Sequence, residues 1–152
     1  MYIYIIIFFT FSLRILMNRK LNTSYLFSCI VIFAGLVILL KNTVNNSFNL
    51  PLIYFSLLTI TFGLLFGYLK GLSFDIYFCN INNRWMMKGS YVSIILLLCN
   101  FISNIILKYT FVHNFHIDYT APIAFALLHF GSSILIIKYI TLQKLNYLKV
   151  TS

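Results

Sequence analysis

The sequence predicts an all-α transmembrane protein, a bundle of five membrane-spanning helices with a short β-hairpin-like loop between the third and the fourth. The 152-residue chain is 61% hydrophobic and only 9% charged, whereas an ordinary soluble domain has about a quarter of its residues charged. Long apolar stretches recur along the whole chain. The few charges fall between these stretches and alternate in number from one connection to the next.

Five stretches come close to the roughly 20 apolar residues that a helix needs to cross the hydrocarbon core of a bilayer. The first is short, but Arg14 near its end can extend its side chain to the headgroups. Pro51 and Pro122 fall in the first turns of the third and fifth stretches, where proline removes no helical hydrogen bond. The expected spans are Tyr2–Met17, Ser24–Leu40, Leu50–Leu69, Ser90–Leu107 and Thr120–Ile137. We therefore expect one integral membrane domain over residues 1–152.

The charges between the spans predict an orientation. In chain order, the four connections and the tail carry three, one, three, one and three basic residues. Because basic residues concentrate on the cytoplasmic side, we expect an inner-membrane protein with its N-terminus outside and its C-terminus in the cytoplasm. Met1–Leu13 is uncharged, and its basic residues follow it. A signal peptide has the opposite order, so we expect an uncleaved first helix.

The longest connection, Gly71–Gly89, departs from the pattern of helix and short turn. Apolar and polar residues alternate around Phe74, Ile76 and Phe78, an Asn-rich turn follows, and a second apolar run begins near Trp85. This order is typical of a β-hairpin. The alternative is an irregular loop held at the membrane interface by its aromatic residues. We favour the hairpin, on the cytoplasmic side.

The third span contains Gly63, Gly67 and Gly71 at intervals of four residues. Glycines at this spacing form a smooth groove on one helix face, into which another backbone can pack closely. The partner could be a second copy of the chain or another helix of the same chain. We favour the same chain, because its helices must pack against one another.

The predicted spans also contain a polar cluster. Asn100 and Asn104 lie one turn apart on the fourth span, and His129 lies near the middle of the fifth. Polar groups within a membrane face the bundle interior by default. His129 could relay protons or bind haem or a metal. We favour a structural role, a neutral imidazole hydrogen-bonded to an asparagine or a serine, because desolvation disfavours the charged ring.

Other patterns for metal or thiol chemistry are weak, and we expect no cofactor. His113, His116 and Asp118 lie close together in the outer loop. A metal site made from one loop without cysteine is unusual, so a plain polar loop is favoured. The cysteines form no C-x-x-C pair, and their number is odd. They are Cys29, Cys79 and Cys99.

No catalytic constellation is recognisable, so we expect no enzyme. The two acidic residues, Asp75 and Asp118, are predicted on opposite sides of the membrane, and no nucleophile, metalloprotease or phosphate-loop motif occurs. The net charge of +9 would suggest nucleic acid in a soluble protein. Here the basic residues flank apolar runs, so we expect no nucleic-acid binding and interpret them as topology signals.

From Gly63 to about Lys144 the chain resembles a group of small bacterial inner-membrane proteins of the CcdC type, named for a cytochrome c biogenesis gene neighbourhood. The matching features are the spaced glycines, Asp75 in the hairpin, Lys88-Gly89-Ser90, Ile106-Leu107-Lys108-Tyr109, Phe130-Gly131-Ser132 and Lys138. The resemblance implies a four- or five-span bundle with no established activity. It transfers no catalytic residue.

These observations favour a non-enzymatic accessory or assembly component of the membrane. One alternative is a small oligomeric transporter or channel that uses Asn100, Asn104 and His129 as pathway residues. Another is a redox or haem-assembly helper, although the missing C-x-x-C gives that reading no chemical support. The expected partners are the lipid bilayer and either further copies of the chain or a larger membrane complex. A water-accessible polar cluster would favour transport, and a dry one would favour a structural role.

Overall fold

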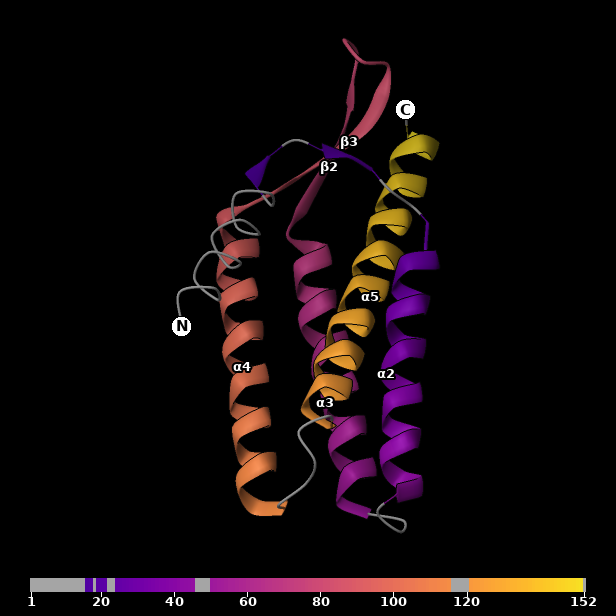
Figure 1. Ribbon diagram of the computed structural model, residues 1–152. Coiled ribbons are helices and arrows are strands. Elements are labelled where there is room, and N and C mark those ends of the chain that lie inside the picture. Colours follow the sequence, from indigo (N-terminus) through magenta and orange to yellow (C-terminus); the bar gives the residue numbers. More distant parts are fainter. Residues whose placement is uncertain (1–15, 18, 22–23, 46–49, 116–120, 152) are drawn as a thin grey trace.

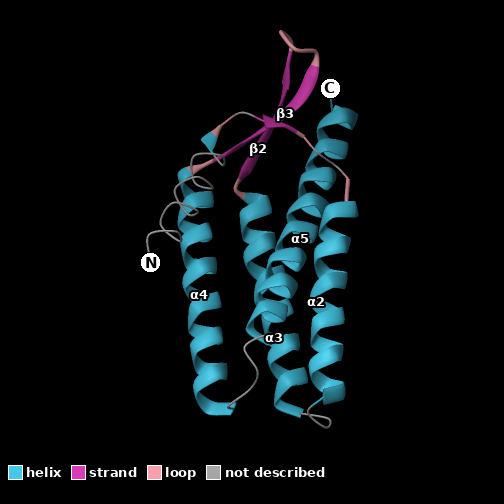
Figure 2. Ribbon diagram, in the orientation of Figure 1, coloured by secondary structure: helices cyan, strands magenta, loops and turns pink. Residues whose placement is uncertain are grey.

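The computed structural model describes residues 16–17, 19–21, 24–45, 50–115 and 121–151. Its elements are β1 (Arg19–Lys20), α2 (Leu26–Asn45), α3 (Leu50–Leu72), β2 (Phe74–Cys79), β3 (Arg84–Gly89), α4 (Tyr91–Phe115) and α5 (Ala121–Thr151). The four helices run side by side, and the strands gather at one end of the bundle (Figures 1 and 2). Apart from its last two residues, the predicted first span lies outside the described residues.

The helical class is confirmed, whereas five membrane crossings are not supported by the described helices. By length and composition, two helical stretches could cross a membrane, Leu52–Leu72 and Ala121–Val150. The apolar parts of α2 and α4 are shorter, at Leu26–Lys41 and Tyr91–Ser103. Polar residues follow each of them, so the uninterrupted apolar length falls below the roughly 20 residues of a full crossing.

Every described helix ends later in the sequence than the span predicted for it, and the difference is largest for α5. The predicted span ends at Ile137, but α5 continues to Thr151. Hydropathy marks where polar residues begin, which need not be where helical hydrogen bonding stops. The continuation is helical because Thr141 and Leu145, one turn apart, are both buried.

α5 is the central helix. α2 and α3 both pack against it extensively, and α4 contacts it least (Figure 1). The sides of its first three turns that face α2 and α3 are buried, including Ala121, Ala124 and Leu128 at 0% exposure, whereas Ile123 and Phe130 are exposed. Apolar residues lie on both the buried and the exposed sides of α5, so its sequence has no amphipathic stripe from which its central position could be predicted.

The predicted hairpin is present. β2 and β3 pair antiparallel from Phe74 opposite Gly89 to Cys79 opposite Arg84. Asn83 adopts a φ of 46° in the turn, a left-handed conformation that asparagine tolerates better than most residues. The sequence did not predict the third strand, β1, which makes the order β1-β3-β2. The base of the hairpin is anchored by Phe74 and Met87, which are buried against Leu97 and Ile137.

Candidate functional site

The evenly spaced glycines of α3 face α5 of the same chain. A Cβ added at Gly63 would lie 2.5 Å from the backbone oxygen of His129 and would also meet the hydroxyl of Ser132. A Cβ added at Gly67 would lie 2.6 Å from the backbone oxygen of Ser133. Because glycine has no side chain, the backbones of α3 and α5 can approach each other closely at these two positions.

The contact loosens toward the hairpin end of the bundle. At Gly71, an added Cβ would lie 2.9 Å from the Cβ of Ile140, and the nearest backbone atom, the Cα of Ile137, would be 3.4 Å away. Gly71 therefore faces a side chain, while Gly63 and Gly67 face the backbone itself. The tightest part of the contact is in the middle of α3.

A second close contact joins α2 to the opposite side of α5. A Cβ at Gly131 would lie 2.6 Å from Cγ1 of Ile32, and one at Gly35 would lie 3.2 Å from the backbone oxygen of Ala124. Sequence reasoning missed this interface because each helix supplies only one glycine. A lone glycine gives no spacing from which to infer a groove.

His129 lies where three helices meet, with 2% of its surface exposed. Its Nδ1 is 3.0 Å from the backbone oxygen of Thr59 on α3. Its Nε2 pairs with the side-chain amide of Asn100 on α4. The contact between α4 and α5 is small, so this hydrogen bond is a principal link between them.

The bonding partners define the protonation of the ring. A backbone oxygen only accepts, so Nδ1 carries a proton and donates it to Thr59. The side-chain oxygen of Asn100 faces Nε2. In a neutral imidazole with its proton on Nδ1, Nε2 accepts, so the Asn100 amide must be flipped, with its oxygen and nitrogen exchanged, to present its N–H to the ring. This arrangement satisfies both ring nitrogens without placing a charge inside the bundle.

The glycine groove and the histidine are one structural unit. A helical side chain covers the turn that precedes its own Cα. Gly63 follows Thr59 by one turn and has no side chain, so the carbonyl of Thr59 stays open to His129. Removing the groove would therefore also remove a hydrogen-bond acceptor of the ring.

The side chains of the other predicted polar residues lie outside the described residues. Asn104 continues α4 one turn beyond Asn100, and its side chain is outside the described residues. The same holds for the side chains of His113, His116 and Asp118. The described residues contain no group of three or more potential metal ligands. The cysteines carry free thiols, and they are Cys29, Cys79 and Cys99.

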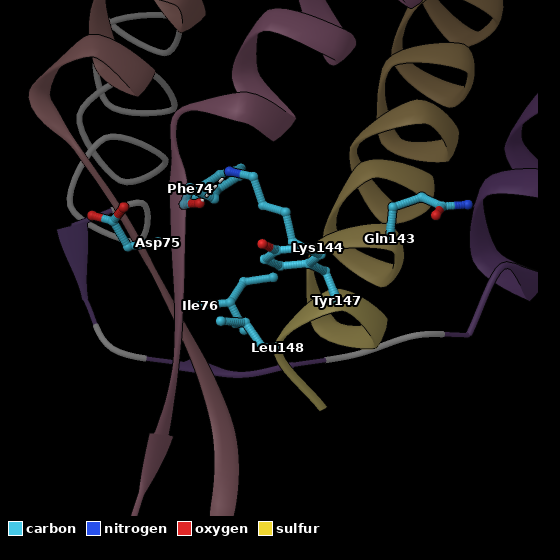
Figure 3. Close-up of a pocket in the computed structure, with 7 residues that line it drawn as sticks. All are labelled: Phe74, Asp75, Ile76, Gln143, Lys144, Tyr147 and Leu148. Atoms are coloured by element: carbon cyan, nitrogen blue, oxygen red, sulfur yellow. Dashed lines mark hydrogen bonds between the residues drawn. The ribbon is translucent and has the colours of Figure 1, made fainter. Parts of the chain in front are cut away.

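A second polar contact lies at the hairpin end and involves the C-terminal extension of α5. The ammonium of Lys144 donates to the backbone oxygens of Leu72, at 2.6 Å, and of Phe74, at 2.8 Å. Figure 3 shows Lys144 reaching across from α5 to the backbone of β2, while Asp75 points away from it. One residue therefore satisfies the last carbonyl of α3 and holds the base of the hairpin.

Replacing Lys144 by methionine is expected to loosen the hairpin base and leave the bundle folded. Methionine keeps most of the apolar stem but donates no hydrogen bond, so the Leu72 and Phe74 oxygens lose their donor. Amide hydrogen exchange over residues 73–79 should accelerate severalfold. Lys41→Met, at the other end of the bundle, is the control. Equal exchange in both variants would contradict the role assigned to Lys144.

No family model, curated protein or solved structure matches this chain.

Proposed function

We propose that the chain is a multi-pass protein of the inner membrane that acts as a non-enzymatic accessory or assembly component. In this proposal the segment before α2 and the four described helices provide five crossings. The N-terminus is outside, and the hairpin and C-terminus are in the cytoplasm. The proposal rests on the distribution of polarity in the bundle.

The apolar side chains of the bundle point outward to an unusual degree. Exposed large apolar residues lie along α2, α3 and α4, including Phe33, Leu57 and Ile102. Polar side chains lie inside, among them Ser56, Thr59 and His129. Monomeric soluble proteins rarely expose contiguous apolar patches beyond a few hundred Å². An apolar exterior around an interior that also holds polar groups is the arrangement that suits lipid. The exposed residues on α2 are Leu26, Phe27, Ile30, Phe33, Leu36, Val37 and Leu40.

The buried polar groups support a structural role over transport. Ser56, Thr59 and Ser132 donate to backbone oxygens of their own helices. His129 has partners for both ring nitrogens and almost no exposed surface. A transport pathway needs polar groups that water or a substrate can reach. In the described bundle, two of the pathway candidates, Asn100 and His129, are instead paired with each other.

Topology reporters are expected to distinguish the two sides of the protein. A reporter inserted in the 42–49 connection should be on the outer side of the inner membrane, and one inserted in the 71–89 hairpin should be in the cytoplasm. When membranes are extracted with alkaline carbonate and centrifuged, the chain should stay in the membrane pellet. The reverse placement of the two reporters would contradict the charge argument, and release into the supernatant would contradict membrane insertion itself.

A further inference from the structure

The outer half of the hairpin carries apolar side chains that nothing in the described chain covers. Phe74 and Met87, at the base, are buried against the bundle. On the same face further out, Phe78 and Trp85 stack edge to face with ring centroids 5.3 Å apart, and Phe78 is 43% exposed. Ile81, in the turn, is 95% exposed. The apolar face thus runs from the core out to the tip.

β2 also has an open edge. β3 is the middle strand of the sheet, so one side of β2 pairs with β3, and the other side pairs with no strand of the described residues. The oxygen of Phe74 accepts from Lys144 of α5, which places it on the side away from β3. Backbone groups of alternate residues point the same way, so those of Ile76 and Phe78 share this outer side.

A cavity of about 390 Å³ adjoins the open edge, between β2 and the end of α5. Ile76, Tyr147 and Leu148 line it and give it an apolar wall (Figure 3). An added strand places alternate side chains on opposite faces. One apolar side chain of a strand added to β2 could enter this cavity.

The charge around the hairpin is positive. The basic residues whose side chains are described at this end are Lys20, Lys70, Arg84, Lys88, Lys138, Lys144 and Lys149, and Asp75 is the acidic one. The full sequence has one other acidic residue, Asp118. A second copy of this chain therefore could not supply an acidic strand, and its own positive charge would be repelled.

The direction of the hairpin excludes the adjacent leaflet as the occupant, if the proposed membrane orientation holds. α5 continues for 14 residues beyond Ile137, about 21 Å at 1.5 Å per residue. The hairpin tip lies beyond the end of α5 in Figure 1. The exposed Ile81 is thus presented to the aqueous phase, away from the lipid.

We propose that the outer edge of β2 and the apolar tip of the hairpin bind an extended, acidic segment of a partner protein by strand addition. Main-chain hydrogen bonds to Ile76 and Phe78 would supply affinity. Arg84 at the rim would select acidic residues. The cavity between β2 and α5 would take one apolar side chain.

A synthetic peptide tests this directly. The full chain in nanodiscs of zwitterionic lipid is titrated with a peptide of alternating Glu and Val, and the emission of Trp85, the only tryptophan, is followed. We expect saturable binding, a blue shift of the emission, and slower hydrogen exchange at Ile76 and Phe78. Ile81→Ser should weaken binding roughly tenfold through lost apolar burial. Arg84→Glu should weaken it roughly fivefold, and Lys41→Glu, at the far end of the bundle, should not.

Ile76→Pro removes one outward N–H while an edge strand tolerates proline, and it should weaken binding without changing the emission of the free protein. Three outcomes would overturn the proposal. They are no binding by chain properly inserted in nanodiscs, equal binding of a Lys/Val peptide, and equal binding of a single-stranded oligonucleotide. A chain that fails to insert at all would instead count against the proposed membrane function.

Discussion

Replacing Gly63 by alanine is expected to lower the free energy of unfolding by about 1–3 kcal/mol, the cost of overpacking a well-packed interior. The new Cβ would lie 2.5 Å from the backbone oxygen of His129. A backbone atom cannot rotate away as a side chain can, so α3 and α5 would have to separate. Gly67→Ala should behave similarly because Ser133 presents its backbone oxygen at 2.6 Å.

The comparison with Gly71→Ala makes this prediction specific. Gly71 faces the side chain of Ile140 and has no backbone atom closer than 3.4 Å, so its alanine variant should lose less stability. Leu65→Ala, on the exposed side of α3, is the control for general effects on the helix. Unfolding in mixed micelles, followed by circular dichroism, measures all four variants. Equal losses at Gly63 and Gly71 would contradict the close backbone contact.

The spacing of the glycines predicted a groove but not its partner. The four-residue spacing of glycines can be read directly from the sequence. The identity of the helix that packs against them depends on the path of the whole chain. α5 offers Ser132 and Ser133 to the groove, and serines also occur on the other helices. Nothing local marks these two as the contact.

The hairpin was predictable because alternation around Phe74, Ile76 and Phe78 is followed by an Asn-rich turn and a second apolar run from Trp85. β1 was not, since Arg19 and Lys20 are too few to show a period of two. Their pairing with Met87 and Met86 is a long-range contact. The same holds for Lys144, which the sequence marks only as a basic residue and the fold places against the carbonyls of α3 and β2.

Asn100 and His129 were predicted to share the bundle interior, and the structure pairs them. The second partner, the backbone oxygen of Thr59, was not foreseen. Helical carbonyls are already bonded within their helix, and sequence reasoning treats them as satisfied. A carbonyl oxygen has a second lone pair, and Gly63 leaves that of Thr59 accessible.

The second large loss of stability is expected when the hydrogen bond between His129 and Asn100 is removed. His129→Leu should lower the free energy of unfolding by about 1–3 kcal/mol, because the half-buried Asn100 amide and the buried Thr59 oxygen both lose their partner. Asn100→Leu should cost less, since the ring keeps its bond to Thr59. The double variant His129→Leu/Asn100→Leu should be more stable than the two single losses combined would give. Interhelical hydrogen bonds in membranes couple by about 0.6 kcal/mol, reaching roughly 1.7, and the double-mutant cycle should fall in that range.

The same residues distinguish the structural role from transport through their access to water. In a variant whose native cysteines are replaced by serine, Asn100→Cys should resist a charged thiol reagent added in water. Ile81→Cys, at the exposed tip, should react readily and serves as the control. If position 100 resists the reagent and the double-mutant cycle gives a measurable coupling energy, the hydrogen bond between Asn100 and His129 is a structural link that holds α4 to α5. Rapid reaction at position 100, together with a coupling near zero, would contradict that link. The polar groups of α4 and α5 would then belong to a water-filled pathway, and the transporter alternative would replace the accessory role.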